Sequence, residues 1–146
     1  MEDSTKRIEN EIEVMAYLQN LRYALDNGAQ IQLQIDRAVD KQRNPKNTNR
    51  YTLSQLFPDE NPVDALKREL KTLTVADYLR TVKDRRFPNK TEMREFGKVY
   101  NANDEVYIKI RVELLSSSGN SGHFVFVMSF HFAVVPFCKE TFPYRK

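Results

Sequence analysis

Apolar residues recur at intervals of three and four positions near the start of the chain, at Val14, Leu18, Leu21 and Leu25. This spacing places them on one face of a helix. Because Ser4 or Thr5 can cap that helix, the pattern predicts a helix from about residue 5 to 26. The strict alternation of polar and apolar residues at 30–35 then predicts a half-buried strand.

Residues 36–51 show no apolar period, which predicts an exposed loop, and we expect Arg37 to Arg50 to be the most mobile internal segment of the chain. Three short helices are predicted after this loop, because capping residues or a first-turn proline occur at the starts of the next apolar runs. They extend from Thr52 to about Phe57, from Asn61 to about Lys71, and from Val75 to about Lys83.

Alternating apolar and polar residues dominate the last third of the chain and predict three strands, at about 92–100, 105–115 and 123–134, with a hairpin loop at 116–122. One side of the second strand carries Val106, Ile108, Ile110, Val112 and Leu114. One side of the third carries Phe124, Phe126, Met128, Phe130 and Phe132. We expect these two sides to form one core against the helices, because an apolar stripe of this size promotes aggregation when it stays in water.

The opposite side of the same two strands then carries the polar side chains, namely Tyr107, Lys109, Arg111, Ser129 and His131. The expected fold class is therefore α+β, with N-terminal helices packed on a C-terminal antiparallel sheet. A length of 146 residues fits a single domain, 1–146, with a helical and charged part at 1–72 and an α+β core at 73–146.

The cysteine content and the first residues favour a cytoplasmic protein. The lone Cys138 cannot form an internal disulfide, and residues 1–4 begin neither a signal peptide nor a transit peptide. The longest apolar stretch, Phe124 to Cys138, is too short and too interrupted to cross a bilayer as a helix. No membrane association is expected.

The net charge of +3, from 23 basic and 20 acidic residues, does not by itself indicate nucleic-acid binding. Two stretches are more basic than the chain as a whole, Arg37–Arg50 and Lys83–Arg94. Each is either an ordinary solvated surface or part of a nucleic-acid interface.

The sequence lacks the usual motifs for metal and cofactor chemistry. None of its four glycines belongs to a phosphate-binding fingerprint, and one cysteine with two histidines does not complete a zinc motif. We therefore expect no metal and no cofactor. His123 and His131 would lie about 26 Å apart along one extended strand, too far to act on the same phosphate.

The remaining residue types suit metal-free cleavage of RNA, which needs a base near the 2′-hydroxyl, cations around the phosphate and an acid for the 5′-oxygen. These types are present in Tyr107, Lys109, Arg111 and His131, and in Arg80 and Lys83 near the end of the preceding helix. Attack through the 2′-hydroxyl is specific to RNA and needs no metal.

Four segments between Leu73 and Ala133 keep the order found in a known toxin family. They are LTVADYLR at 73–80, MREFGKVY at 93–100, VYIKI at 106–110 and VMSFH at 127–131. Over these segments, about two-fifths of the chain, the sequence resembles the MqsR-type mRNA-interferase toxins, relatives of the RelE-like fold. The resemblance implies a RelE-like core, a metal-independent endoribonuclease, RNA as substrate with or without the ribosome, and an antitoxin protein as partner.

The resemblance also implies roles for single residues. It places Tyr107 on the family's catalytic tyrosine, Arg80 on its helix-end lysine, and His131 on the lysine that follows Ser-Phe. The expected substrate-binding cations are Lys109, Arg111, Lys83 and Lys98. Gly97 stands where the family has a functional glutamine, which bears on substrate preference and on activity itself.

Two other classes of function also fit the sequence. A non-enzymatic phage or mobile-element protein that inhibits a host machine accounts better for the charged residues 1–72, and its effect would survive loss of the three expected catalytic side chains. A nucleic-acid-binding regulator with Arg37–Arg50 as an arm would bind with a steep salt dependence and cleave nothing.

Overall fold

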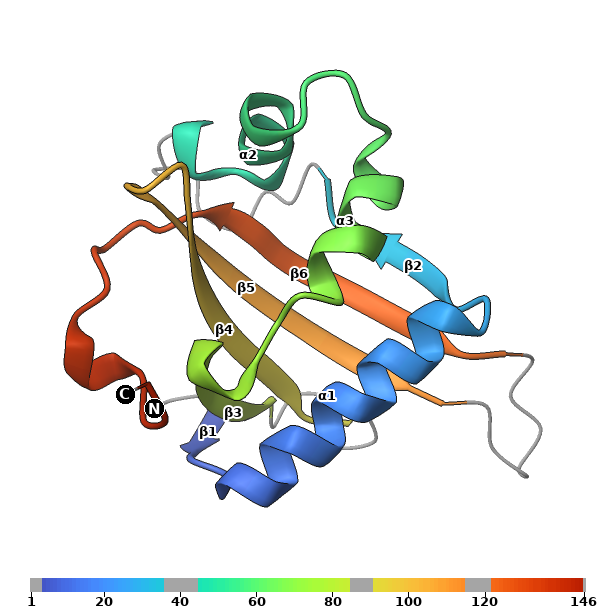
Figure 1. The fold of residues 1–146 in the computed structure, drawn as a ribbon, viewed down its shortest axis with the longest axis vertical. Coiled ribbons are helices and arrows are strands. Elements are labelled where there is room, and N and C mark those ends of the chain that lie inside the picture. The colour runs from blue at the N-terminus through green and yellow to red at the C-terminus, as the bar shows by residue number, and fades with distance from the viewer. Residues whose placement is uncertain (1–3, 36–44, 85–90, 115–121, 146) are drawn as a thin grey trace.

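The fold is α+β, as expected from the sequence (Figure 1). A computed structural model describes residues 4–35, 45–84, 91–114 and 122–145. The described residues form the helices α1 (Glu11–Asp26), α2 (Asn49–Leu56) and α3 (Pro62–Leu70). They also form the strands β1 (Ser4–Arg7), β2 (Gln30–Leu33), β3 (Tyr78–Asp84), β4 (Met93–Tyr100), β5 (Asp104–Glu113) and β6 (Phe124–Phe132).

The strands form one sheet in the order β1-β3-β4-β5-β6-β2. Neighbouring strands are antiparallel, except that β2 runs parallel to β6. α1 and α3 lie over one face, which we call the helix face, and the opposite face is called the second face (Figure 1). Within the part of the chain that the structure describes, the helices fall short of the length and apolar content that a membrane span requires.

The main core lies between the helices and the central strands of the sheet. Its most deeply buried side chains include Leu18, Leu21 and Leu25 of α1, Leu66 and Leu70 of α3, and Phe96, Ile108, Ile110, Val125 and Val127 of the sheet. The helical spacing seen in the sequence of α1 is therefore the spacing of the residues that it buries.

The prediction that the first helix begins near residue 5 is wrong. Residues 4–7 pair with β3 as the edge strand β1. α1 begins at Glu11, because Asn10 and Glu13 cap it reciprocally. The Glu13 N–H donates to Asn10 Oδ1 at 2.8 Å, and the Asn10 N–H donates to Glu13 Oε1 at 3.1 Å.

Two of the three predicted short helices are confirmed. α2 begins at Asn49 rather than at Thr52, because the Thr48 side chain accepts a backbone N–H bond as the N-cap. α3 has Asn61 as its N-cap and Pro62 in its first turn, as the sequence predicts.

The third short helix, predicted from Val75 to Lys83, is wrong. Only residues 75–77 form a 3-10 turn, and the chain then continues as β3 between β1 and β4. Backbone partners on both sides, together with the β-branched side chains of Thr81 and Val82, favour a strand over a helix in this place.

Two predicted loops lie largely outside the described residues. They are the segment 36–51, described only from residue 45, and the hairpin loop 116–122, described only at residue 122. Residues 45–51 belong to a 3-10 turn and to the start of α2, so the predicted loop is wrong for that part.

A β-bulge in β6 exchanges the faces of that strand halfway along. The pairing of Lys109 with Ser129 is followed by the pairing of Ile110 with Val127, so Met128 is an extra residue in β6. Because side chains alternate with a period of two, one extra residue moves every side chain beyond it to the other face.

The bulge makes part of the predicted face assignment wrong. Phe130, after the bulge, is buried on the helix face as predicted. Before the bulge, Val125 and Val127 are buried on that face instead, while Phe124 and Phe126 turn to the second face and are half-buried. The second face of β6 thus keeps its polar side chains only beyond Met128.

Side chains of α2 take the place of a neighbouring strand along the second half of β6. Asn49 Nδ2 donates to the carbonyl of Met128 at 3.0 Å, and Asn49 Oδ1 accepts the N–H of Phe130 at 2.9 Å. Thr52 Oγ1 accepts the N–H of Phe132 at 2.8 Å. β2 pairs only with the first half of β6, so α2 satisfies backbone groups that β2 does not reach.

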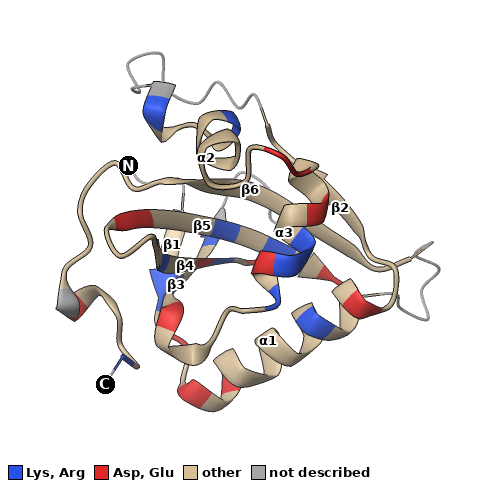
Figure 2. Ribbon diagram, turned by 45° about the horizontal axis from the view of Figure 1, so that its top comes forward, with Lys and Arg blue, Asp and Glu red and all other residues tan. Residues whose placement is uncertain are grey.

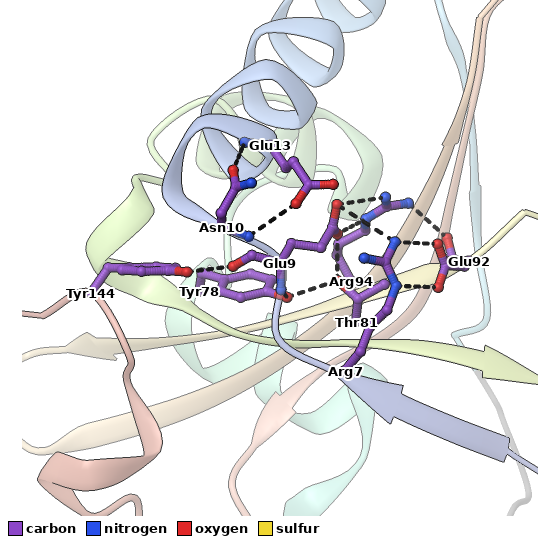
Figure 3. A network of polar contacts seen from close by, with 9 residues as sticks. All are labelled: Arg7, Glu9, Asn10, Glu13, Tyr78, Thr81, Glu92, Arg94 and Tyr144. Carbon is purple, nitrogen blue, oxygen red and sulfur yellow. Dashed lines mark hydrogen bonds and ion pairs between the residues drawn. The ribbon is translucent and has the colours of Figure 1, made fainter.

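A buried polar network fixes the start of α1 to the sheet (Figure 3). The Glu9 carboxylate, in a residue only 4% exposed, accepts a hydrogen bond from Arg94 Nε at 2.8 Å and one from the Thr81 hydroxyl. Burial by itself raises the pKa of Glu9, but these hydrogen bonds outweigh it and hold that pKa below its usual value. The Glu9 N–H donates to Tyr78 Oη at 3.0 Å, and the Tyr144 hydroxyl donates to the Glu9 carbonyl.

Candidate functional site

The second face of the sheet carries a cavity of about 590 Å³. The strands contribute a mainly polar floor, formed by Leu79, Arg80, Tyr107, Lys109, Ser129 and His131. The wall comes from the C-terminal segment, residues 133–145, through residues 133–138 and Thr141. The cavity therefore has one polar and one mainly apolar side.

Strand register brings the polar side chains of the floor together in two rows. The first row is Arg80, Glu95, Lys109 and Ser129, and the second is Gly97, Tyr107 and His131. Each residue pairs with the next across two neighbouring strands, and such partners lie about 5 Å apart. Ser129 and His131 lie beyond the bulge at Met128 and share this face with Lys109 and Tyr107, whereas before the bulge the same face of β6 carries Phe124 and Phe126. Each of β3, β4 and β5 carries two basic residues, which Figure 2 shows across the sheet.

A buried carboxylate links the two cations of the first row. Glu95 Oε1 accepts a hydrogen bond from Arg80 Nε at 2.6 Å, and Glu95 Oε2 lies 3.9 Å from Lys109 Nζ. Burial by itself lowers the pKa of the Arg80 guanidinium, but the hydrogen bond to Glu95 and the negative charge of Glu95 together outweigh it, and that pKa lies above its usual value. Arg80 is therefore cationic at every relevant pH, and its terminal nitrogens carry further N–H donors beyond the one given to Glu95.

The second row brings an imidazole and a phenol into contact. The rings of Tyr107 and His131 have centroids 5.4 Å apart and are tilted by 42°. His131 Nδ1 lies 2.9 Å from the Phe132 carbonyl oxygen, which can only accept, so Nδ1 carries the hydrogen. In the neutral ring the lone pair is then on Nε2, which makes that nitrogen the basic one.

The wall is held in place by contacts on both sides of the sheet. The Phe137 N–H donates to the Glu105 carboxylate at 3.2 Å. Farther along, Tyr144 reaches the start of α1 by its bond to the Glu9 carbonyl, and Arg145 forms an ion pair with Asp77 at 3.6 Å. The C-terminal segment is thus fixed at its middle and at its end.

Gly97 provides the space that the wall occupies. A Cβ at Gly97 would lie 2.8 Å from Cε2 of the Phe137 ring and 2.9 Å from Cζ of Phe142. The two rings meet edge to face, with centroids 5.4 Å apart at 87°. A residue with a side chain at this position would force the wall to move.

Four of the seven predicted site residues line this cavity, namely Arg80, Tyr107, Lys109 and His131. Arg80 lies on the strand β3 and not at the end of a helix. The predicted element is therefore wrong, although the residue does line the cavity. The register pairing and the ring contact agree with the expected placing of Tyr107 and His131 on the same side of the sheet.

The other three predicted residues do not line the cavity. Arg111 is on the second face, where its guanidinium lies 5.0 Å from the centre of the Phe126 ring. Lys98 is on the helix face and donates to the Thr72 hydroxyl. Lys83 lies on β3 where that strand pairs with β1.

Sequence reasoning missed Glu95 and the apolar wall. The alternation of β4 contained a signal for Glu95, because its partner on β5 is Lys109 once the two strands are paired. The run Val134-Val135-Pro136-Phe137 follows the last strand and ends its alternation, which was a signal that the chain turns back over the sheet. Neither signal shows how close Glu95 or the wall lies to the predicted site residues until the strand register is known.

Comparisons with protein-family models, with curated proteins and with solved structures found no match for this chain. The resemblance to MqsR-type toxins therefore stays a prediction that rests on the quoted segments. Among residues 4–35, 45–84, 91–114 and 122–145, no three His, Cys, Asp or Glu side chains come together as a set of metal ligands.

Proposed function

We propose that the protein is a metal-independent endoribonuclease, the toxin of a toxin–antitoxin pair, which cleaves RNA through the 2′-hydroxyl. The observation that supports this proposal is the presence of Arg80, Lys109, Tyr107 and His131 around one cavity. Two of these side chains are cations for a phosphate, and two can exchange a proton with a ligand.

In the proposed reaction, Nε2 of His131 takes the proton of the 2′-hydroxyl, and the 2′-oxygen attacks the adjacent phosphorus. The bond from phosphorus to the 5′-oxygen breaks, and the Tyr107 hydroxyl gives its proton to that leaving oxygen. The products are a 2′,3′-cyclic phosphate and a 5′-hydroxyl. Arg80 and Lys109 bind the non-bridging oxygens, where negative charge increases in the transition state. Proton exchange with water restores both side chains.

The proposal includes a RelE-like core within residues 73–146. Its support is the antiparallel run β3-β4-β5-β6, which carries the polar floor of the cavity on one face and packs against α1 on the other. The proposal also includes an antitoxin protein as partner, which the resemblance to MqsR-type toxins implies, and a cytoplasmic location, which the lone Cys138 favours.

The proposal is tested by incubating the purified protein with single-stranded RNA in excess EDTA. We expect cleavage with 2′,3′-cyclic phosphate ends, and no cleavage of the same oligonucleotide with 2′-O-methyl groups, because these cannot be deprotonated. RNA that stays intact in long incubations, both with and without ribosomes, would contradict the proposal.

Two lysine variants distinguish an effect of the cavity from an effect of the protein's overall charge. Lys109→Gln removes a cation from the cavity, and we expect it to lower the cleavage rate about a hundredfold, as loss of a transition-state donor does. Lys98→Gln removes the same charge from the helix face and should leave the rate near that of the wild type.

One observation favours the second candidate, a non-enzymatic binding protein. Ile12 of α1 is 78% exposed, and Ile8 and Met15 beside it are also exposed. Exposed apolar side chains of this size, two of them in α1 and one just before it, suit contact with a protein partner. If this surface carries the function, Ile12→Lys abolishes the growth effect, whereas joint replacement of Tyr107 and His131 leaves it intact.

A further inference from the structure

The apolar wall of the cavity exposes side chains that a folded protein usually buries. Val135 is 72% exposed and Val134 is 59% exposed, and both line the cavity. Pro136 and Phe137 continue the same wall, so residues 133–137 present only apolar side chains to the ligand space. An apolar surface that faces a cationic floor across one cavity suits a ligand with an anionic part and an apolar part.

The wall is also preorganised. Phe137 is fixed through its N–H to Glu105 and through its ring, which packs edge to face on Phe142 over Gly97. A ring that is already ordered loses little conformational freedom when a flat ligand stacks on it. These contacts make Phe137 an ordered aromatic side chain of the cavity on which a base can stack.

We propose that this wall is a nucleobase subsite, in which Phe137 stacks on the base of the nucleotide whose phosphate is bound by Arg80 and Lys109. The inference rests on the proposed function, because it takes the anionic part of the ligand to be an RNA phosphate. Inorganic phosphate would leave the apolar wall in contact with water, and an apolar ligand would make no use of the net positive charge that Arg80, Lys109 and Glu95 carry together. A nucleotide occupies both sides of the cavity.

The chemistry of the wall also sets the expected base preference. Ala133 to Phe137 carry no side-chain donor or acceptor, and the Thr141 hydroxyl of the wall is already bonded to the backbone of Cys138, so the wall contacts the flat surface of a base and not its hydrogen-bonding edge. Stacking of this kind tolerates every base. We therefore expect little discrimination by this subsite among bases beyond the larger stacking area of purines.

The inference is tested with two probes that differ only in the base, adenosine 5′-monophosphate and ribose 5-phosphate, by calorimetry at low salt in EDTA. We expect the wild type to bind adenosine 5′-monophosphate about tenfold more tightly or better. Phe137→Leu should remove most of that difference while leaving ribose 5-phosphate binding unchanged. Arg80→Gln should weaken both probes, because it removes a phosphate donor.

Two variants serve as controls for folding and position. Val135→Ser changes a side chain that is already largely exposed, so the fold should tolerate it, and we expect weaker binding of adenosine 5′-monophosphate alone. Val63→Ala changes another exposed valine, in α3 and away from the cavity, and should change neither probe. Equal binding of the two probes to the wild type, or equal weakening of both by Phe137→Leu and by Val135→Ser, would overturn the subsite.

The subsite and the proposed function can fail separately. If the binding results are as expected but RNA stays intact in EDTA, the nuclease proposal fails and the nucleotide site stands. If RNA is cleaved but the base adds nothing to binding, the nuclease proposal stands and the subsite is wrong.

Discussion

Gly97 and Phe137 lie so close together that no side chain fits between them, since an added Cβ would come within 2.8 Å of the Phe137 ring. The resemblance to the toxin family expects a functional glutamine at this position. In this chain the aromatic rings of the C-terminal segment fill the space in which the side chain of that glutamine would begin. A side chain at this position and the wall in its present place therefore exclude each other.

We expect Gly97→Ala to lower the free energy of unfolding by about 1–3 kcal/mol, because the new methyl group forces two packed rings to move. Urea unfolding measures this change. Gly122→Ala is the matched control, since nothing lies within 4 Å of a Cβ at that position. Equal stability of the two variants would show that the wall adjusts without cost.

The bond between Asn49 and the bulge in β6 should contribute strongly to stability. Asn49→Ala leaves the Phe130 N–H and the Met128 carbonyl without their partner in a buried place, and we expect a loss of at least about 2 kcal/mol. Asn47→Ala removes bonds to the Phe132 and Ala133 carbonyls from a half-buried position, where water can replace them. Unfolding by urea should show a clearly smaller loss for Asn47→Ala.

The free energy of unfolding should decrease in acid, because the Glu9 carboxylate becomes protonated there. Because its pKa in the folded protein lies below the usual value of 4.5, the carboxylate stabilises the fold above that value and loses this contribution as the pH falls through the folded pKa. We expect Glu9→Gln to cost about 3 kcal/mol at pH 7, because it leaves Arg94 without its ion pair, and to cost less as the pH falls below 4.5.

Urea unfolding at a series of pH values measures that difference. The exposed Glu11→Gln is the control, with a small effect at every pH. A cost of Glu9→Gln that stays constant from neutral pH into acid would contradict the assignment.

Conservative replacements at the second row of the cavity should stop catalysis and leave the fold intact. Tyr107→Phe keeps the ring contact with His131 but removes the proposed acid, and His131→Gln keeps bulk in a residue that is only 4% exposed. We expect each to lower the rate of RNA cleavage about a hundredfold or more. Thermal unfolding checks that both variants fold, and a wild-type rate in either would remove that residue from the proposed mechanism.

Local pattern was enough to predict the elements with the strongest periodicity. The alternation of β5 and the helical spacing of α1 both predicted which residues are buried, because each element packs on one side along its whole length. The same reasoning failed for residues 78–83, whose state depends on two strands that are distant in the sequence. Local propensity does not contain that information.

The site could be predicted only in part for a similar reason. The phenylalanine pattern of β6 continues unbroken through Met128, so nothing in the sequence shows that the strand changes faces there. The sequence nevertheless predicts Tyr107 and His131 on the same face of the sheet. Their pairing lies beyond the bulge, where side chains alternate between the faces without interruption. Glu95 and the wall depend on register and on the path of residues 133–145, which no local pattern sets.

The order of the strands has a consequence for how the chain folds during synthesis. β2 pairs with β6 across more than ninety positions, as the register of Gln30 with Phe124 shows, and β1 pairs with β3 at similarly long range. The two edge strands and α1 therefore leave the ribosome long before the strands that they join. Loop closure over such separations is slow. We expect the apolar stripe of α1 to stay without its sheet partners until β6 has left the ribosome, so the sheet closes only after residue 132 has been synthesised.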